Sequence, residues 1–355
     1  MKAAILKSVE NLELEEVPEP KPGPGELVIQ VKACAVCGTD VKVYHHGHKH
    51  IVFPRITGHE VSGVVIKCGA GVTNYQPGDR VIVAPAIPCG QCHYCRRGYQ
   101  TMCDQLKAIG YHYDGGFAEE MKVPAAAVAN GCVNHIPQGV SFTEATLAEP
   151  LACVINGQKL SQVGLGDTVL ILGAGPIGCL HAQLARAVGA GQVILAEVLP
   201  ERLKMAEFTG AILVDLSRED IVEKVKQLTA GRMAERVIVA ATSHQAQEKA
   251  VELVAKRGSV NFFGGLPKEK PVINLNSNLV HYGEFMIVGT HGSAPRDNEL
   301  AIGLIARKDI TAKAYLTSIL PLEQIHEALH LAEIRQGLKV VVTPSNSDQG
   351  ESNDG

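Results

Sequence analysis

The sequence lacks any uninterrupted run approaching 18 apolar residues, which argues against a transmembrane helix. It also lacks an excess of basic residues, because 33 Lys and Arg stand against 37 Asp and Glu, for a net charge of -4. Charge therefore gives no reason to expect binding to nucleic acid or to an anionic membrane. The first residues, MKAAILKSVENLELEEV, lack the apolar core and the small-residue cleavage site of a secretory signal. We expect a cytoplasmic protein that acts on small molecules.

The sequence does have enough apolar residues for two hydrophobic cores. Its 355 residues exceed the size at which single cores usually stop growing. Hydrophobic residues make up 46% of the chain and charged residues 20%, as is usual for globular proteins. We therefore expect two domains.

The hydrophobic periodicity changes near residue 150. Before it, short runs such as ELVIQVKAC, VSGVVIKCG and DRVIVAPA are separated by KPGPG and YQPGD, which predicts an all-β, turn-rich half. After it, apolar strands alternate with amphipathic helices, beginning at DTVLILGAGPIGCLHAQLARAVGA, which predicts a buried parallel sheet and the α/β class. From about Arg296 we expect two helices and a closing strand, LKVVVTP. The polar tail, residues 345–355, is expected to be disordered.

The stretch VLILGAGPIG places a glycine-rich turn between an apolar strand and a helix. The turn has the GxGxxG spacing and contains Gly173, Gly175, Pro176, Ile177 and Gly178. Such a turn lets the backbone approach a pyrophosphate at the helix N-terminus. Glu197 ends the next strand, where an acid accepts hydrogen bonds from the adenosine ribose and repels a 2′-phosphate. We predict that NAD binds here, with NADP as the alternative because Arg202 follows closely.

Ten cysteines in a chain without an export signal argue against a disulfide framework, because cytosolic thiols stay reduced. Four of them form a C-x2-C-x2-C-x7-C set: Cys89, Cys92, Cys95 and Cys103. Four thiolates suit a closed tetrahedral zinc site with no position left for chemistry, so we predict a structural zinc. A ferredoxin-type cluster is less favoured because the run does not end in C-x3-C-P. A nucleic-acid-binding zinc ribbon is less favoured because CRRG supplies only two adjacent arginines.

A second set of metal-type ligands lies in the β-rich half. CAVCGTD supplies Cys37, GHEVSGVV supplies His59 and Glu60, and LAEPLACV supplies Glu149 near the junction of the two halves. Thiolate, imidazole and carboxylate are all zinc ligands, and a catalytic zinc typically uses three protein ligands. Each residue also has a simpler interpretation, because a lone cysteine usually packs and His-Glu is common on surfaces.

Cys34 and Cys37 form a CxxC pair. A thioredoxin-like motif needs a helix that begins directly after a strand, which CAVCGTDV does not predict. We therefore interpret this spacing as coincidence. The scattered cysteines are expected to be packing residues.

With these motifs in hand, the sequence is identified as a member of the zinc-dependent medium-chain dehydrogenases. GHEVSGVVIKCGAGV resembles the signature of this family, and the CGQCHYC lobe resembles its structural zinc loop. The resemblance runs from Met1 to about Pro344 and is strongest to the polyol (sorbitol) and threonine dehydrogenase branch, because EPLA places Glu149 where alcohol dehydrogenases have a second catalytic cysteine. It implies a GroES-like catalytic domain over residues 1–152 and 290–355, and a Rossmann NAD-binding domain over residues 153–289.

The resemblance also implies roles for individual residues. Cys37 and His59 would hold a catalytic zinc, with Glu60 and Glu149 as alternative carboxylates that bind it directly or through water. Thr39 would relay the substrate proton, and Asp40 would orient a ligand. Cofactor contacts are expected from Thr242, Phe263 and Gly264.

Two features near this site depart from the family pattern. Lys42 stands where the family often has histidine, and Tyr44 lies one place later than the family's substrate-contacting tyrosine. The loop VYHHGHKH, with Lys42, Lys49 and Arg55, is interpreted either as a cationic rim for a substrate that carries carboxylate or phosphate, or as a solvated loop.

The function predicted from these observations is a zinc- and NAD-dependent dehydrogenase that oxidises a secondary alcohol of a polyol or sugar derivative to the ketone. It would carry two zinc ions per chain and form a homodimer or homotetramer. The alternatives are a dehydrogenase of L-threonine or another hydroxy acid, and a non-catalytic NAD-binding protein.

Overall fold

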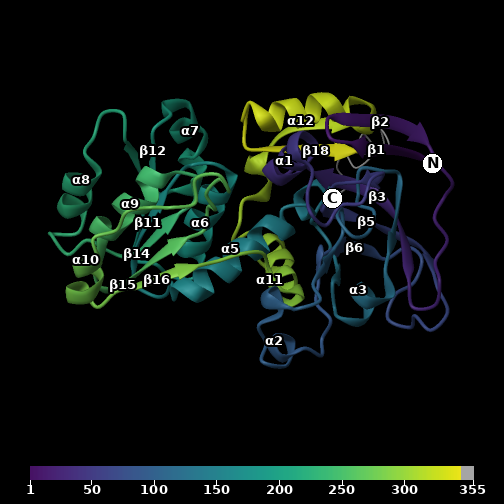
Figure 1. Cartoon of the computed structure of the whole chain (residues 1–355), viewed down its shortest axis with the longest axis horizontal. Helices are drawn as coiled ribbons and strands as arrows, with labels where there is room; N and C mark the ends of the chain where they lie inside the picture. Colours follow the sequence, from purple (N-terminus) through teal and green to yellow (C-terminus); the bar gives the residue numbers. More distant parts are fainter. Residues whose placement is uncertain (345–355) are drawn as a thin grey trace. The chain divides into compact units, whose positions relative to one another are not determined.

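The computed structural model describes residues 1–344 and contains two compact units (Figure 1). The first unit comprises Met1–Ala152, Ser293–Lys308 and the described residues from Ala312 onward, and the second comprises Cys153–Gly292 and Asp309–Thr311. The tail expected to be disordered, residues 345–355, lies outside the described residues. Among residues 1–344, no helix combines the length and apolar character that a membrane crossing requires.

The first unit is built on antiparallel strands around its own hydrophobic core. A seven-stranded sheet has the order β10 (Val133–His135), β6 (Arg80–Val83), β5 (Glu60–Cys68), β3 (Leu27–Ala35), β18 (Lys339–Thr343) and β17 (Leu316–Pro321), with β9 (Glu120–Val123) also paired to β3. A three-stranded sheet has the order β2 (Asn11–Glu16), β1 (Lys2–Ser8) and β4 (Arg55–Ile56), and β7 (Ala86–Ile87) pairs with β8 (Lys107–Ala108). Only the β17–β18 pair of the large sheet is parallel.

The central strand β3 fixes the register that matters for function. Its sequence LVIQVKACA is buried along nearly its whole length, because both faces of the strand are covered. At its end, Ala35 pairs with Glu60 of β5 on one side and with Val341 of β18 on the other. Residues distant in the sequence are thereby brought to one point of the sheet.

The first unit is β-rich rather than all-β, because short helices follow several strands. They are α1 (Gly38–His46), α2 (His93–Arg96), α3 (Ala125–Ala129), α4 (Phe142–Ala145), α11 (Pro295–Ala306) and α12 (Ile325–Glu333), with the 3-10 turns Gln100–Met102, Ala312–Tyr315 and Leu322–Gln324. CAVCGTDV carries no clear signal for a helix start, yet α1 begins within it. Strand β3 ends at Ala35, Cys37 is the N-cap of α1, and the helix begins at Gly38. Asp40 Oδ2 accepts from the Cys37 backbone N–H at 2.9 Å, which stabilises this helix start.

The second unit is a parallel sheet whose strands alternate with helices in the sequence (Figure 1). The strand order is β13 (Ile212–Asp215), β12 (Gln192–Glu197), β11 (Thr168–Leu172), β14 (Ala234–Val239), β15 (Val254–Phe262) and β16 (Met286–Gly289). The helices are α6 (Pro176–Ala187), α7 (Pro200–Met205), α8 (Ile221–Leu228), α9 (His244–Leu253) and α10 (Ser277–Gly283), with the 3-10 turn Glu207–Thr209; helix α5 (Ala148–Ser161) enters from the first unit. This is the Rossmann order, with the first strand β11 at the centre, and it confirms the predicted α/β class.

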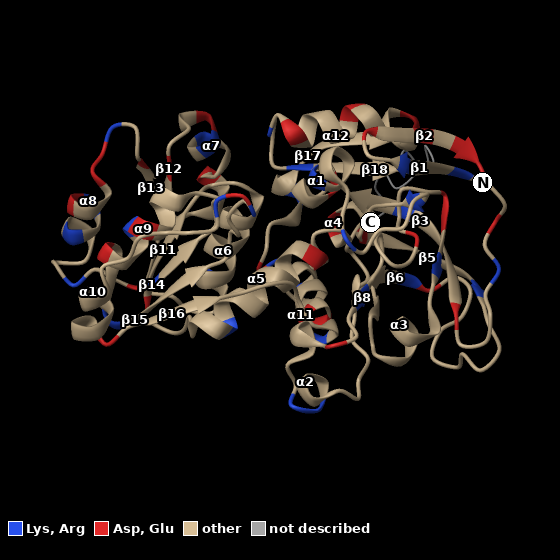
Figure 2. Cartoon of the chain, viewed as in Figure 1, with Lys and Arg blue, Asp and Glu red and all other residues tan. Residues whose placement is uncertain are grey.

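Acidic and basic side chains are mixed along the elements of each unit (Figure 2). A blue turn follows α2, where Arg96 and Arg97 are adjacent. This interspersed pattern agrees with the small net charge of -4.

Candidate active site and metal centres

Three of the predicted ligands come together in the first unit. One donor atom each from Cys37, His59 and Glu60 lies within 4.8 Å of the others. Cys37 is the N-cap of α1, which begins just after β3, and the other two stand at the start of β5. Because β3 and β5 pair in the register that places Ala35 beside Glu60, the two segments meet at this point.

Asp40 connects two members of this cluster. Both Asp40 and His59 are buried, and His59 Nδ1 lies 3.3 Å from Asp40 Oδ1. Burial alone would lower the pKa of His59, but Asp40 and Cys37 outweigh it and hold that pKa well above its usual value. The Thr39 hydroxyl lies 3.5 Å from the Cys37 sulfur.

Glu60 forms a buried ion pair that the sequence analysis did not predict. The Lys339 ammonium lies 2.6 Å from Glu60 Oε1 and 2.5 Å from Oε2, and it donates to the Val36 carbonyl at 3.2 Å. Burial raises the pKa of the Glu60 carboxyl to about 7, with the Lys339 ammonium opposing the rise. Burial would lower the pKa of Lys339, but Glu60 reverses that effect and the pKa is raised. A lysine in the apolar strand LKVVVTP was the sequence signal for this pair.

Glu149 and Tyr111 lie at the edge of the cluster. Glu149 is in the first turn of α5 and outside the group whose donor atoms lie within 4.8 Å, yet its charge contributes to the raised pKa of Glu60 and of Lys339. The Tyr111 ring centroid lies 6.0 Å from that of His59, and burial strongly raises the pKa of its hydroxyl. No motif pointed to Tyr111, because its turn has no distinctive spacing.

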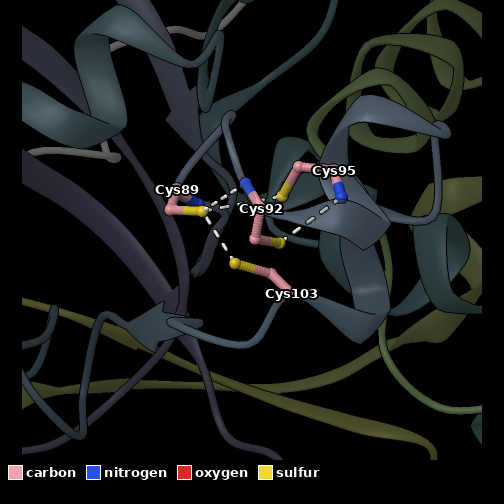
Figure 3. Close-up of side chains that lie close together, drawn as sticks. All are labelled: Cys89, Cys92, Cys95 and Cys103. Carbon is pink, nitrogen blue, oxygen red and sulfur yellow. Dashed lines mark hydrogen bonds between the residues drawn. The ribbon is translucent and has the colours of Figure 1, made fainter.

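The four clustered cysteines turn their sulfurs toward one another in a single loop (Figure 3). Their ligand atoms all lie within 4.8 Å, and the sulfurs of Cys89 and Cys95 are 4.0 Å apart. A tetrahedral zinc site with Zn–S bonds of about 2.3 Å places its sulfurs roughly 3.8 Å apart, so the arrangement fits this ion. None of these cysteines forms a disulfide.

Backbone N–H groups already favour thiolate in part of this loop. Cys92 N–H donates to Cys89 sulfur at 3.3 Å, and Cys95 N–H donates to Cys92 sulfur at 3.5 Å. Such bonds lower the pKa of Cys89, and they lower the pKa of Cys92 to about 6. Burial raises the pKa of Cys103 and, together with its neighbouring thiols, raises that of Cys95 to about 12. A bound cation would be needed to ionise all four together.

The three glycines of the turn after β11 meet different steric demands. Gly173 has φ +109°, and a Cβ on Gly178 would lie 1.8 Å from the Gly173 carbonyl oxygen, so the fold itself requires glycine at both positions. Gly175 has φ -73°, and its Cβ would meet only an Arg202 nitrogen at 3.6 Å. Gly175 therefore leaves a space that no other described part of the chain fills. This space lies at the N-terminus of α6, which begins with Pro176 and Ile177.

Glu197 ends β12 beside this turn. Its Oε2 accepts from the Ala174 N–H at 2.9 Å, and its Oε1 accepts from the N–H groups of Val198 and Leu199 at 2.8 and 3.2 Å. A carboxylate has about four lone-pair sites, so these three bonds leave capacity for one more donor.

The remaining predicted cofactor residues follow β14 and β15. Gly264 has no space for a side chain, because a Cβ would lie 2.5 Å from the Ala241 carbonyl oxygen. Thr242 is exposed beside it, and Phe263 packs edge-on against the buried His181 with ring centroids 4.7 Å apart. All three lie beyond the carboxyl ends of parallel strands, where ligands gather in sheets of this kind. Tyr44 is turned elsewhere, since its hydroxyl donates to the Glu10 carbonyl at 3.2 Å.

Comparison with known proteins assigns this geometry to a family. Residues 23–136 match the alcohol dehydrogenase GroES-like domain, and residues 176–307 match the zinc-binding dehydrogenase family. Sorbitol dehydrogenase of Halalkalibacterium halodurans is 33% identical over 335 residues, covering 93% of this chain and 95% of the relative. L-threonine 3-dehydrogenase of Pyrococcus horikoshii is 36% identical over 295 residues, covering 81% of this chain and 82% of the relative.

A solved structure agrees with these matches. A Sinorhizobium meliloti 1021 protein bound to NADP superposes with a TM-score of 0.90 at 33% identity, covering 97% of this chain and 99% of that protein. The chain therefore belongs to the zinc-dependent medium-chain dehydrogenases, in the branch of the polyol and threonine dehydrogenases, and is an alcohol dehydrogenase.

Proposed function

We propose that this enzyme uses zinc and NAD to oxidise a secondary alcohol of a polyol or sugar derivative to the ketone. The observation that carries the proposal is the cluster of Cys37 with the buried His59 and Glu60, set in a chain that also has the glycine-rich turn of a nucleotide-binding sheet. The similarity to a sorbitol dehydrogenase supports a polyol substrate.

The donor set at this cluster fits zinc. Its thiolate, imidazole and carboxylate are all zinc ligand types, and one donor atom of each lies within 4.8 Å of the others. Zinc bound at this point would supply a Lewis acid that favours loss of the substrate's hydroxyl proton. Cys37 and His59 would hold the ion, and Asp40 would fix the imidazole orientation. The Thr39 hydroxyl, 3.5 Å from the Cys37 sulfur, would carry the proton away.

The third ligand is proposed to be Glu149. Both oxygens of Glu60 are engaged by the Lys339 ammonium, which lowers the capacity of Glu60 to bind a cation. Glu149 is only half-buried and lies close enough for its charge to act on Glu60. Glu60 remains the alternative ligand if its ion pair opens.

A second zinc is proposed at Cys89, Cys92, Cys95 and Cys103. Four sulfurs within 4.8 Å of one another would fill a tetrahedral coordination shell and leave no position for substrate. This ion would stabilise the loop around α2, so its role would be structural.

NAD is proposed as the cofactor because Glu197 ends β12 with capacity for one more donor, as a ribose hydroxyl would supply. The space beside Gly175 would admit the pyrophosphate at the N-terminus of α6. NADP is the alternative, since the Arg202 side chain lies beside Gly175 and a similar structure binds NADP.

L-threonine is a second candidate substrate. The Pyrococcus threonine dehydrogenase, at 36% identity, is more similar over its matched residues than the sorbitol dehydrogenase, at 33%. A homodimer or homotetramer stays a prediction from the family resemblance, and a cytoplasmic location stays a prediction from the N-terminal sequence. Sedimentation and cell fractionation would test them.

The deciding experiment measures metal content and NAD reduction on the same preparation. We expect two zinc ions per chain, and growth of NADH absorbance at 340 nm with one class among polyols, sugar acids, sugar phosphates and L-threonine. Turnover of L-threonine alone would favour the second candidate. One zinc ion and no turnover with any class would favour a non-catalytic NAD-binding protein.

The cofactor assignment has its own test. Glu197→Gln should reduce the kcat/KM preference for NAD over NADP by about tenfold, which corresponds to roughly 1.4 kcal/mol. Glu235→Gln is the matched control, because Glu235 also accepts from a backbone N–H, that of Thr168, at the start of β11. An unchanged preference in Glu197→Gln would show that the ribose contact lies elsewhere.

A further inference from the structure

A group of basic and aromatic side chains lies next to the metal cluster of the first unit. The Tyr111 ring lies near both His59 and His48, with ring centroids 6.0 and 5.0 Å apart, respectively. From His48 the ring contacts continue to His50 at 5.2 Å, and His50 stacks on His112 at 4.9 Å. We define His48, His50 and His112, with Arg55 and Lys107, as the histidine rim.

Two rim histidines are fixed as hydrogen-bond donors. His112 Nδ1 accepts from the Ala108 N–H at 3.1 Å, and His48 Nδ1 accepts from the His50 N–H at 3.3 Å. A neutral imidazole whose Nδ1 accepts must carry its proton on Nε2. In its neutral form, each of these rings therefore carries its proton on Nε2.

The side chains that act on the pKa of His112 are all basic. Burial lowers its pKa first, and His50, Lys107 and Arg55 lower it further. Asp114 is the carboxylate in ion-pair contact with Arg55, at 2.8 Å from its Nη1. The Arg55 Nε is buried and has no hydrogen-bond partner. The rim thus holds a buried N–H donor without an acceptor, together with a histidine whose pKa is lowered by burial and by nearby basic groups. A bound anion would accept from that donor and balance the basic groups.

We infer that the histidine rim binds the terminal oxyanion, a carboxylate or a phosphate, of a hydroxylated substrate whose alcohol carbon reacts at the Cys37–His59 cluster. The inference rests on the proposed function and narrows its substrate class to sugar acids and polyol phosphates. The Tyr111 ring, near both His59 and His48, would line the path along which the carbon chain extends. Arg55 would supply the charge, and the imidazole Nε2–H groups would supply directed hydrogen bonds.

The test compares matched substrates of one carbon skeleton: a hexitol, its 1-phosphate and the corresponding aldonate. We expect the wild type to prefer one of the two anions over the hexitol by at least tenfold in kcat/KM, and the preferred anion identifies the oxyanion. Arg55→Met should lower kcat/KM for that anion at least tenfold more than for the hexitol. Lys107→Ala, an exposed substitution that should fold normally, should act in the same direction by about threefold. His135→Gln is the matched control, because His135 also stacks on an aromatic ring, that of Tyr75, outside the rim.

A binding measurement separates this inference from the proposed function. Titration of the zinc-loaded protein with inorganic phosphate, followed by the NMR signals of the histidine rings, should give saturable shifts that weaken at least fivefold in Arg55→Met and persist in His135→Gln. Saturable binding without turnover of any alcohol would overturn the proposed function and leave the rim as an anion site. Turnover of the hexitol with no preference for either anion and no phosphate binding would overturn the rim and leave the proposed function standing.

Discussion

The two cysteine-bearing clusters of the first unit hold their sulfurs by different means. The Cys89–Cys103 loop is local, and backbone N–H groups donate to its sulfurs at 3.2–3.5 Å. The Cys37 cluster is assembled from the end of β3, the start of β5 and β18, and its polar neighbours are the side chains of Asp40 and Lys339. Backbone N–H groups are the polar neighbours of the sulfurs in the first cluster, and charged side chains are the polar neighbours in the second.

This difference fits the proposed roles, a structural site in the cysteine loop and a catalytic site at the Cys37 cluster. Four thiolates with N–H donors need only a cation to be complete, and they leave no position for a substrate. A buried cluster balanced by ionised side chains is more sensitive, because the loss of one partner leaves another charge uncompensated in a low-dielectric interior. The two clusters should therefore fail differently when one residue is changed.

The largest effect is expected at the second cluster. Cys37→Ser should lower kcat at least about a thousandfold, or roughly 4 kcal/mol, because Cys37 is a proposed ligand of the catalytic zinc. Metal content should fall from two ions per chain to one, while NAD binding, followed by fluorescence of NADH, should be retained. Cys68→Ser is the matched control, since Cys68 ends β5 and donates only to the Tyr75 carbonyl at 3.5 Å. Near-full activity of Cys37→Ser would remove the metal assignment.

Lys339→Met should destabilise the first unit by about 3–5 kcal/mol, because it leaves the buried Glu60 carboxylate without its cation. Chemical denaturation at pH 8 measures the loss. The double variant Lys339→Met/Glu60→Gln should recover most of it, because no uncompensated charge remains. If the single variant is as stable as the wild type, Glu60 is neutral in the folded protein and the ion pair has been misjudged.

Cys92→Ser should lower stability more than it lowers activity. We expect the loss of one bound metal and a fall in Tm of roughly 5–10 °C, or about 2–3 kcal/mol, with kcat within about threefold of the wild type. Metal analysis and calorimetry on one preparation would show this. A variant that keeps its Tm but loses activity would place the chemistry at the cysteine loop and reverse the comparison.

The cysteine loop could be predicted in full because its ligands depend only on local spacing. Cys89, Cys92 and Cys95 are three residues apart, so a tight turn brings their sulfurs together whatever the rest of the chain does. The glycine-rich turn could also be predicted from the sequence, because the local backbone geometry requires glycine at Gly173 and Gly178. The α/β class followed from the apolar strands, of which β11 is buried at every position.

The surroundings of the Cys37 cluster were harder to predict from the sequence, because they depend on strand register and on residues that are far apart in the chain. Lys339 and Glu60 are 279 residues apart in the sequence. They come together because β18 and β5 pair with opposite sides of β3. Helix α1 was missed because its cap is Cys37 with Asp40, a pair whose propensity for helix starts is less familiar than serine with glutamate. Tyr111 reaches His59 from a turn without any marked pattern.

The smallest effect is expected at the far end of α1, where His45 lies between two carboxylates. Its Nδ1 is 2.9 Å from Glu10 Oε1 and its Nε2 is 2.9 Å from Glu333 Oε1. Glu10 and then Glu333 raise the pKa of His45 above its usual value, although burial opposes them. The stabilisation is therefore complete below about pH 6.5 and is lost as the pH rises through the higher folded pKa.

His45→Gln should cost only about 0.5 kcal/mol at pH 6, because solvent screens this partly exposed contact, and the cost should vanish by pH 9. The measurement is the free energy of unfolding of both proteins across this pH range, with His326→Gln on α12 as the control. Metal content should stay at two ions in every variant, because α1 holds Cys37 at its opposite end and the Asp40 cap does not depend on His45. A pH-dependent loss of metal in His45→Gln would show that the helix couples its two ends, and that the second cluster relies on charges beyond Asp40 and Lys339.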